Sequence, residues 1–303
     1  MKRVMLSILA LALFVCSAKA QLLYKISGNG LSKPSYIIGT FHLAPAPIID
    51  QITGAREALN IVEQVCGEID LDEATTLEHE PLMQHVHLLP FSLRIDDVLS
   101  DEEMDRLNAF MHKKLGYDYT SDYIYATMSA LRPSSLASEF ANMMFAEAIP
   151  NYEAGNYMDA YFQSEAQRLN KGYTALESVE FQMELLYGPT TIEEELEELL
   201  FIVDYPDIYE FGIHQIVDAY YSQNLRELSR ALKYAGGKED SFDDVMIVRR
   251  NNNWIELMPK MMAEHSTLFV VGSAHLPQRC GMIRLLRKAG YKVTPVKKKK
   301  QVS

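Results

Sequence analysis

Residues 37–43 read IIGTFHL, and residues 270–277, near the other end of the chain, read VVGSAHLP. Each stretch is an apolar run followed by a glycine, a small hydroxyl residue, one further residue and a histidine. Such a run predicts a buried strand, and ligands of open α/β sheets bind in the crevice at the carboxyl ends of the strands, where glycine permits close backbone approach. A lone histidine after a strand is more often structural. Two copies favour a shared site containing His42 and His275.

With further apolar runs, the sequence predicts six strands in all, near 22–27, 35–40, 65–71, 173–177, 267–272 and 291–296. An amphipathic helix at 50–63, with Asp50 as its candidate N-cap, follows the second segment, and the order strand, helix, strand is typical of an α/β sheet. The sequence is helical at about 96–170 and 179–264. We therefore expect one α/β (α+β) domain over residues 21–303, with a central mixed β-sheet flanked by helices and a large helical insertion covering one side.

Three charged residues complete the candidate site. Glu68 lies in the apolar segment VCGEID, Glu177 ends the segment near 173–177, and Arg250 lies in RRNNNW. Two histidines and one or two glutamates at converging strand ends form a ligand set for a divalent metal that activates water. Each charged residue also has a structural alternative: a buried salt bridge for Glu68, a helix N-terminus for Glu177 and a helix surface for Arg250.

The first twenty residues have the three parts of a secretory signal peptide: a basic start at Lys2 and Arg3, an apolar run over residues 4–16, and small residues at Ala18 and Ala20. The apolar run is thirteen residues long, whereas a membrane-spanning helix needs about 17–25. We therefore expect cleavage after Ala20, and a mature protein without a transmembrane segment that is periplasmic or secreted. An uncleaved N-terminal anchor is the alternative.

The composition limits the partners. The chain has 41 acidic and 29 basic residues and a formal net charge of −12, whereas nucleic acids and anionic membranes bind clustered positive charge. The basic run at 297–300 lies at the extreme C-terminus and is typical of a solvated tail. We therefore expect no nucleic acid partner. Cys66 and Cys280 form either a disulfide or one buried and one exposed thiol, and the oligomeric state stays open.

The order of these motifs resembles the TraB/GumN family. The resemblance rests on the Gly-Thr-x-His opening, Glu68, Leu176-Glu177 with Gln182, Arg250-Asn251 with Trp254, and the closing GSAHLP followed by LLRKAGYKV. It covers the mature chain, and the helical middle is its most divergent part. This family is related to the membrane-tethered Tiki metalloproteases, and more distantly to erythromycin-esterase-like and haem-binding proteins.

The resemblance implies a metal-dependent hydrolase, in particular a metallopeptidase with a peptide or protein substrate. It places His42, Glu68 and His275 at the centre as metal ligands, with Mn²⁺, Co²⁺ or Zn²⁺ as the candidate ion. Glu177 and Arg250 match positions typical of the bacterial branch, so all five residues are candidate catalytic residues. We expect alanine in place of either histidine to leave the fold largely intact. The alternative function is a non-catalytic extracytoplasmic binding protein for haem or a peptide.

Overall fold

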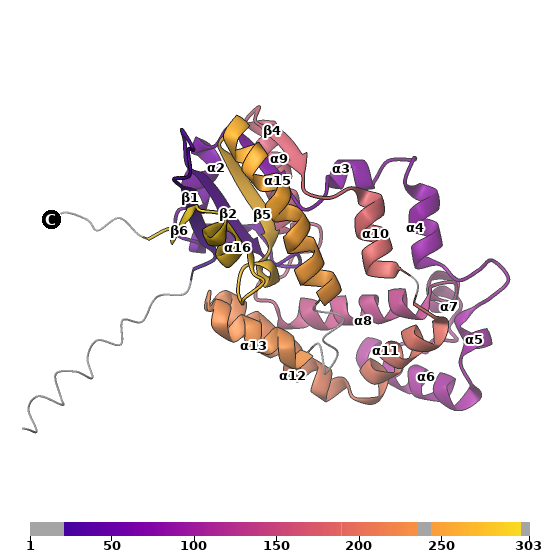
Figure 1. Ribbon diagram of the computed structural model, residues 1–303. Helices are drawn as coiled ribbons and strands as arrows, with labels where there is room; N and C mark the ends of the chain where they lie inside the picture. The colour runs from indigo at the N-terminus through magenta and orange to yellow at the C-terminus, as the bar shows by residue number, and fades with distance from the viewer. Residues whose placement is uncertain (1–20, 189, 236–243, 298–303) are drawn as a thin grey trace, which may run out of the picture.

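The computed structural model describes residues 21–188, 190–235 and 244–297. Six strands form one mixed sheet in the order β4-β3-β5-β2-β1-β6, and a helical region extends from one side of it (Figure 1). The strands are β1 (Leu23–Ser27), β2 (Ser35–Thr40), β3 (Gln64–Gly67), β4 (Gly172–Ala175), β5 (Thr267–Gly272) and β6 (Lys292–Pro295). The α/β fold predicted from the sequence is confirmed, because a strand lies at each of the six predicted segments.

Four adjacent strands, β4, β3, β5 and β2, run parallel to one another. β5 pairs with β2 on one side, where Gly272 lies opposite Thr40, and with β3 on the other, where Phe269 lies opposite Cys66. β3 also pairs in parallel with β4, while β1 is antiparallel to both β2 and β6. Every residue of β2 and β5 is buried, as expected for parallel strands covered on both faces. The carboxyl ends of β4, β3, β5 and β2 therefore share one edge.

Helices and short helical turns connect the strands. Up to β4 they are η1 (Ala46–Gln51), α2 (Ala55–Ile61), α3 (Leu71–Ala74), α4 (Glu80–His87), α5 (Ile95–Val98), α6 (Asp101–Leu115), α7 (Asp122–Met128), α8 (Pro133–Ala148) and α9 (Met158–Arg168). After β4 they are α10 (Val179–Tyr187), α11 (Ile192–Asp204), α12 (Pro206–Tyr221), α13 (Leu225–Ala235), η2 (Asp244–Arg249), α15 (Arg250–Glu264), η3 (Ser273–His275) and α16 (Met282–Lys288). The ends follow local sequence: Ser100 and Glu103 form a capping box at the start of α6, and Gly116 ends it with a φ of 72°.

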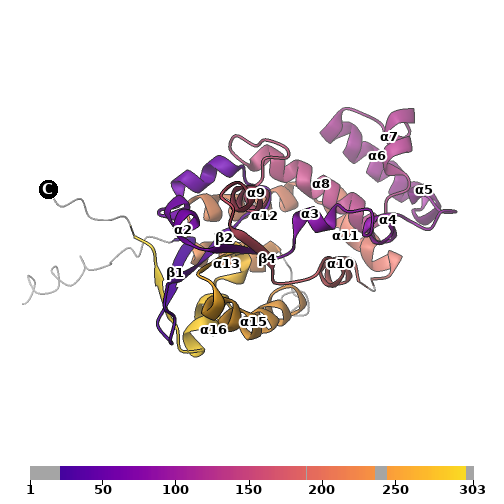
Figure 2. The same ribbon diagram turned by 90° about the horizontal axis from the view of Figure 1, so that it is seen from above.

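The described part of the chain contains two large apolar cores and a small third cluster of Val86, Val179 and Met183. The first surrounds the sheet and includes Phe162 of α9, Tyr220 of α12 and Trp254 of α15. Figure 2 shows α2 and α9 on one face of the sheet and α15 and α16 on the other. The second core lies among α5 to α8, α11 and α12, in the region farthest from the sheet in Figure 1. The helices predicted as one insertion therefore fall into two groups, because α9, α13 and α15 contribute to the core that surrounds the sheet, whereas α5 to α8 and α11 contribute to the second core.

The helix predicted at 50–63 begins later than expected, so its predicted N-cap is wrong. α2 starts at Ala55 after Gly54, whose φ of 83° lies in the left-handed region that favours glycine. Asp50 lies in η1 instead, and its carboxylate accepts a hydrogen bond from Arg56 at 3.0 Å. Asp50 therefore forms an exposed ion pair with Arg56 and does not cap α2.

The strand predicted at 65–71 is also too long. β3 ends at Gly67, so Glu68 follows the strand rather than lying inside it. Asp70 caps α3 by accepting hydrogen bonds from the first backbone N–H groups of that helix. The chain therefore turns directly after Gly67, which brings Glu68 to the edge of the sheet.

Cys66 and Cys280 are free thiols in the structure. Cys66 is fully buried in β3, where burial raises the pKa of its thiol, and Cys280 is partly exposed ahead of α16. The disulfide is therefore the wrong alternative. Within the described ranges, no helix has the length and apolar character needed to span a bilayer. The predicted signal peptide, residues 1–20, lies outside the described residues, as do residues 298–303.

Candidate functional site

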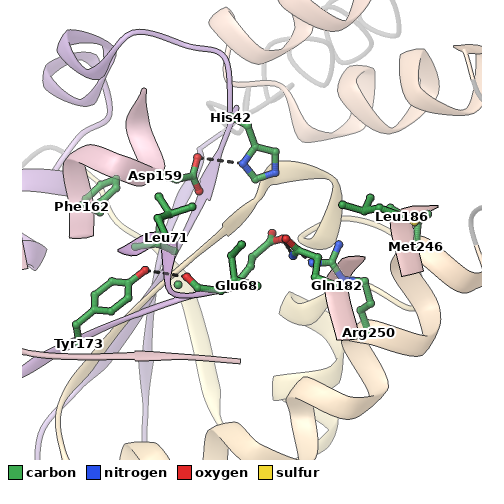
Figure 3. Close-up of a pocket in the computed structure, with 13 residues that line it drawn as sticks. His42, Glu68, Leu71, Asp159, Phe162, Tyr173, Gln182, Leu186, Met246 and Arg250 are labelled. Atoms are coloured by element: carbon green, nitrogen blue, oxygen red, sulfur yellow. Dashed lines mark hydrogen bonds and ion pairs between the residues drawn. The ribbon is translucent and has the colours of Figure 1, made fainter. Parts of the chain in front are cut away.

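The four parallel strands each deliver one predicted site residue to the shared edge. Glu177 follows β4, Glu68 follows β3, His275 follows β5 and His42 follows β2. Strand ends on one edge of an open α/β sheet bring together residues that are distant in sequence. Figure 3 shows the resulting cavity, with His42 on one side and Glu68 facing Arg250 on the other.

Three of these side chains meet around Gly272. A β-carbon placed on Gly272 would lie 3.2 Å from Nε2 of His42, 3.3 Å from Oε1 of Glu68 and 3.6 Å from Cδ2 of His275. The last glycine of β5 therefore keeps open the space that the two imidazoles and the carboxylate share. The structure brings together the three residues that the sequence motifs single out as metal ligands.

Arg250 is the first residue of α15, and it is buried, so the surface alternative is wrong. Its Nη2 donates to Oε2 of Glu68 at 2.5 Å, and its Nε and Nη2 donate to Glu177 at 2.9 Å. Its Nη1 donates to Nε2 of His275 at 3.2 Å. The indole N–H of Trp254 donates to Glu177 at 2.8 Å. One buried cation thus compensates two buried carboxylates, which would be costly alone.

Glu68 is held in its ionised form. Its Oε1 accepts the backbone N–H of Gly272 at 2.6 Å, and its Oε2 accepts the guanidinium of Arg250. Burial alone would raise the pKa of Glu68, but the electrostatic interactions with His275, His42 and Arg250 and the Gly272 hydrogen bond outweigh burial and lower the pKa to about 2. The salt bridge expected as a structural alternative for Glu68 is therefore present.

Asn251 fixes the tautomer of His275. The Asn251 amide nitrogen donates to the carbonyl oxygens of His275 at 3.3 Å and Cys280 at 2.9 Å. Its Oδ1 must therefore accept the Nδ1–H of His275, at 2.8 Å. Burial lowers the pKa of His275 to about 3. The ring is therefore neutral, and its unprotonated Nε2 lies 3.9 Å from Oε1 of Glu68.

Asp159, in the first turn of α9, orients His42. Its Oδ2 lies 3.0 Å from Nδ1 of His42, and its Oδ1 accepts the hydroxyl of Thr40 at 2.9 Å. The carboxylate raises the pKa of His42. With Nδ1 bound to Asp159, the Nε2 atom of His42 faces the space beside Gly272 (Figure 3).

The two histidines differ in burial. The side chain of His42 is 61% exposed, whereas that of His275 is 4% exposed and its ring centroid lies 4.3 Å from that of Trp254. Alanine at position 275 would open a cavity and leave the buried Oδ1 of Asn251 without its partner. The expectation that alanine leaves the fold intact therefore suits His42 and does not suit His275.

A cavity of about 300 Å³ opens beside these groups. Its polar wall contains His42, Glu68, Asp159, Gln182 and Arg250, and its apolar wall contains Ile69, Leu71, Phe162, Leu186 and Met246. Small-molecule and peptide sites commonly combine a few converging polar groups with apolar lining in this way. The cavity thus has the composition of a ligand site.

Sequence reasoning missed Asp159 and the tautomer-fixing role of Asn251. An acid in the first turn of a helix is ordinary, since it stabilises the helix dipole. The available signal is the spacing of Asp159 three residues before Phe162, which places both on the buried face of α9. Asn251 follows Arg250 in the motif RRNNNW, but nothing in that motif indicates which asparagine is buried.

The donor set fits a divalent metal in chemistry and in orientation. Two imidazoles present Nε2 while a carboxylate or an amide oxygen holds Nδ1, which is how metal-ligating histidines are usually held. Glu68, Glu177 and Asp159 also outnumber the permanent cation Arg250. At their present spacing, however, no three His, Cys, Asp or Glu side chains in the described part of the chain could hold an ion. The lone pair of His275 instead accepts a hydrogen bond from Arg250, at 3.2 Å.

The protein belongs to the α/β class. His, Glu and Arg side chains gather at the carboxyl edge of the parallel strands of its mixed sheet. The model of the TraB/PrgY/gumN family matches residues 22–295, and the chain belongs to this family. The resemblance inferred from the motifs is thereby confirmed. Comparison with curated proteins and with solved structures yields no match.

Proposed function

We propose that the protein is an exported, metal-dependent hydrolase that cleaves peptide bonds at the edge of its sheet, with Mn²⁺, Co²⁺ or Zn²⁺ held by His42, Glu68 and His275. The convergence of the three side chains around Gly272 is the observation that carries the proposal. Export rests on the pattern of residues 1–20. The apolar cavity of about 300 Å³ favours a peptide side chain over a macrocycle as large as haem.

A divalent ion at such a site supplies a Lewis acid that polarises a carbonyl group and lowers the pKa of water. The chain's own residues prepare the site for it. Asp159 and Asn251 hold the two imidazoles so that Nε2 of His42 faces the space beside Gly272 and Nε2 of His275 lies 3.9 Å from Oε1 of Glu68. These contacts remove the need to reorganise the rings during the reaction.

In this proposal, Arg250 stabilises negative charge on the substrate. Glu68 and Glu177 anchor its Nε and Nη2 atoms, while its Nη1 contacts no carboxylate among the described residues. A donor fixed in a site from which water is largely excluded stabilises the charge that develops on a carbonyl oxygen. Arg250 is therefore the candidate oxyanion-stabilising residue.

The apolar wall predicts the preferred substrate. In a digest of a peptide library by metal-supplied wild-type protein, we expect cleavage beside large apolar residues. Leu186→Arg should lower kcat/KM for these peptides about tenfold or more, because loss of apolar complementarity costs 1–3 kcal/mol. Leu257→Arg is the matched control, because both leucines are similarly exposed, 43% and 45%, and Leu257 does not line the cavity.

Two outcomes of this digest are informative in different ways. Cleavage without an apolar preference, or equal losses in both leucine variants, would remove the role given to the apolar wall. An absence of cleavage by wild-type protein supplied with each of the three metals would overturn the hydrolase proposal itself. Tight binding of uncleaved peptides would then favour the non-catalytic alternative.

Gly272 provides a test of the shared space. Gly272→Ala places a methyl group within 3.6 Å of all three proposed ligands, so we expect metal affinity to fall about tenfold or more, in the range seen when the surroundings of a metal site are disturbed. The melting temperature should change little, since exposed His42 can move aside. Calorimetric metal titration and thermal unfolding measure the two effects.

Gly39→Ala is the structural counterpart. Its β-carbon would lie 2.7 Å from Cδ1 of Leu276 and 3.0 Å from Cα of Ser273. It should therefore destabilise the fold by about 1–3 kcal/mol, as overpacking does.

If Gly272→Ala binds metal as tightly as the wild type, the three ligands do not share the space beside Gly272.

A further inference from the structure

A second hollow, away from the candidate active site, gathers positive charge. It has a volume of about 640 Å³ and lies between α13, α16 and the segment that follows η3. Four cationic side chains line it: Arg226, Arg230, Lys233 and Arg287. None of the lining residues in the described part of the chain is acidic. The chain has a net charge of −12, so the positive charge of the hollow is opposite to that of the whole molecule.

The cations of the hollow are exposed, and no ion pair with a described residue neutralises them. None of the four forms an ion pair with another described residue, and all are exposed in the structure. Arg226, Arg230 and Lys233 follow the spacing i, i+4, i+7, which places them on one face of α13. Like charges at such spacing repel and destabilise a helix by a few tenths of a kcal/mol per pair. A bound anion would relieve this repulsion.

The rest of the hollow is shaped by packing. Leu225 is buried, and Tyr24, Pro277 and Ile283 are partly buried beside it. Gln278, also in the lining, has a φ of 73°, in the left-handed region that side chains other than Asn, Asp and Gly seldom adopt. Backbone strain of this kind clusters at ligand sites. A hydrogen bond to the backbone fixes the side chain of Arg287, because its guanidinium donates to the carbonyl oxygen of Val293 at 2.7 Å.

The spacing of the cations indicates the size of the ligand. From Arg226 to Lys233 the helix rises about 10 Å at 1.5 Å per residue. A single phosphate group is too small to contact all the cations at once. Arginine binds phosphate through paired hydrogen bonds, and lysine binds it as a point charge.

We propose that this hollow is a binding site for a ligand with two or more phosphate groups, either a free oligophosphate or the headgroup of an anionic lipid. The sequence shows only the basic run at its C-terminus, because the cations of the hollow come from two helices, and Arg287 is more than fifty positions from Lys233. The site does not depend on the proposed hydrolase activity.

The test is calorimetric titration of the full chain with sodium tripolyphosphate at low ionic strength. We expect wild-type protein to bind, and Arg226→Gln/Arg230→Gln to weaken binding about tenfold or more, since a hydrogen bond to a charged group contributes about 1.5–3 kcal/mol. Lys113→Gln/Lys260→Gln is the matched control. It removes the same charge at exposed positions on α6 and α15 and should bind as the wild type does.

A second arm separates the two sources of phosphate. Sedimentation with vesicles of phosphatidylcholine containing cardiolipin, but not of phosphatidylcholine alone, supports a lipid headgroup if Arg226→Gln/Arg230→Gln abolishes it. Binding of tripolyphosphate without vesicle binding supports a free oligophosphate. The proposal is overturned if wild-type protein binds neither probe, or if both double variants lose binding equally.

Discussion

His42→Ala is expected to lower peptide hydrolysis by about 100-fold or more, because it removes one of three proposed ligands from a site whose chemistry depends on the ion. The fold should tolerate the change. The side chain is 61% exposed, and its hydrogen bond is made to Asp159 at 3.0 Å. Exposed substitutions usually change stability by less than about 0.5 kcal/mol, which corresponds to a shift in Tm of about 1–2 °C in a protein of this size.

A second exposed histidine provides the control for this variant. His112 is 69% exposed and pairs with Asp118 at 2.9 Å, but it lies on α6, outside the cavity. His112→Ala should leave both hydrolysis and Tm unchanged. Asp159→Asn keeps the shape of the side chain and removes the charge behind the imidazole of His42. It should lower metal affinity about 10–100-fold, and its loss of hydrolysis should lie between those of His112→Ala and His42→Ala. Full activity of His42→Ala would remove His42 from the site.

Arg250→Ala is expected to destabilise the protein by about 3–5 kcal/mol, as breaking a buried ion pair does. The variant leaves Glu68 and Glu177 buried without their cation, and their side chains are only 8% and 2% exposed. It also removes the cation that lies 4.9 Å from the ring of Trp254. Chemical denaturation at neutral pH measures the change in the free energy of unfolding.

Arg168→Ala is the surface control for this effect. Arg168 is 64% exposed and pairs with Glu165 three residues earlier on α9, so its loss should cost about 0–1 kcal/mol. Arg250→Lys keeps the charge but cannot contact both carboxylates with the same fork, so we expect a loss between those of the other two variants. Equal destabilisation by Arg168→Ala and Arg250→Ala would contradict the central position of the arginine.

Much of the fold follows from local sequence patterns. The apolar runs that became β2 and β5 are buried along their whole length, and a fully buried strand tolerates few polar residues. The boundaries were less predictable. α2 begins at Ala55 because Gly54 adopts a left-handed conformation, and β3 ends at Gly67 because the chain turns there, neither of which hydrophobic periodicity reports.

The candidate site was predictable where it depends on strand ends. His42 and His275 could be placed together because parallel strands deliver their carboxyl ends to one edge. Asp159 and the buried position of Arg250 were not predictable in the same way, because they depend on how α9 and α15 pack against the sheet. The hollow beside α13 was missed for a similar reason, since Arg287 comes from another helix.

The most direct test of the account is a titration of metal-stripped protein with Co²⁺, followed by visible absorption. We predict uptake of one equivalent by wild-type protein, with the d–d bands of an ion bound by nitrogen and oxygen ligands, and loss of those bands in His42→Ala but not in His112→Ala. Uptake without such bands, no stoichiometric uptake, or the same spectrum from His42→Ala would contradict a metal centre formed by His42, Glu68 and His275.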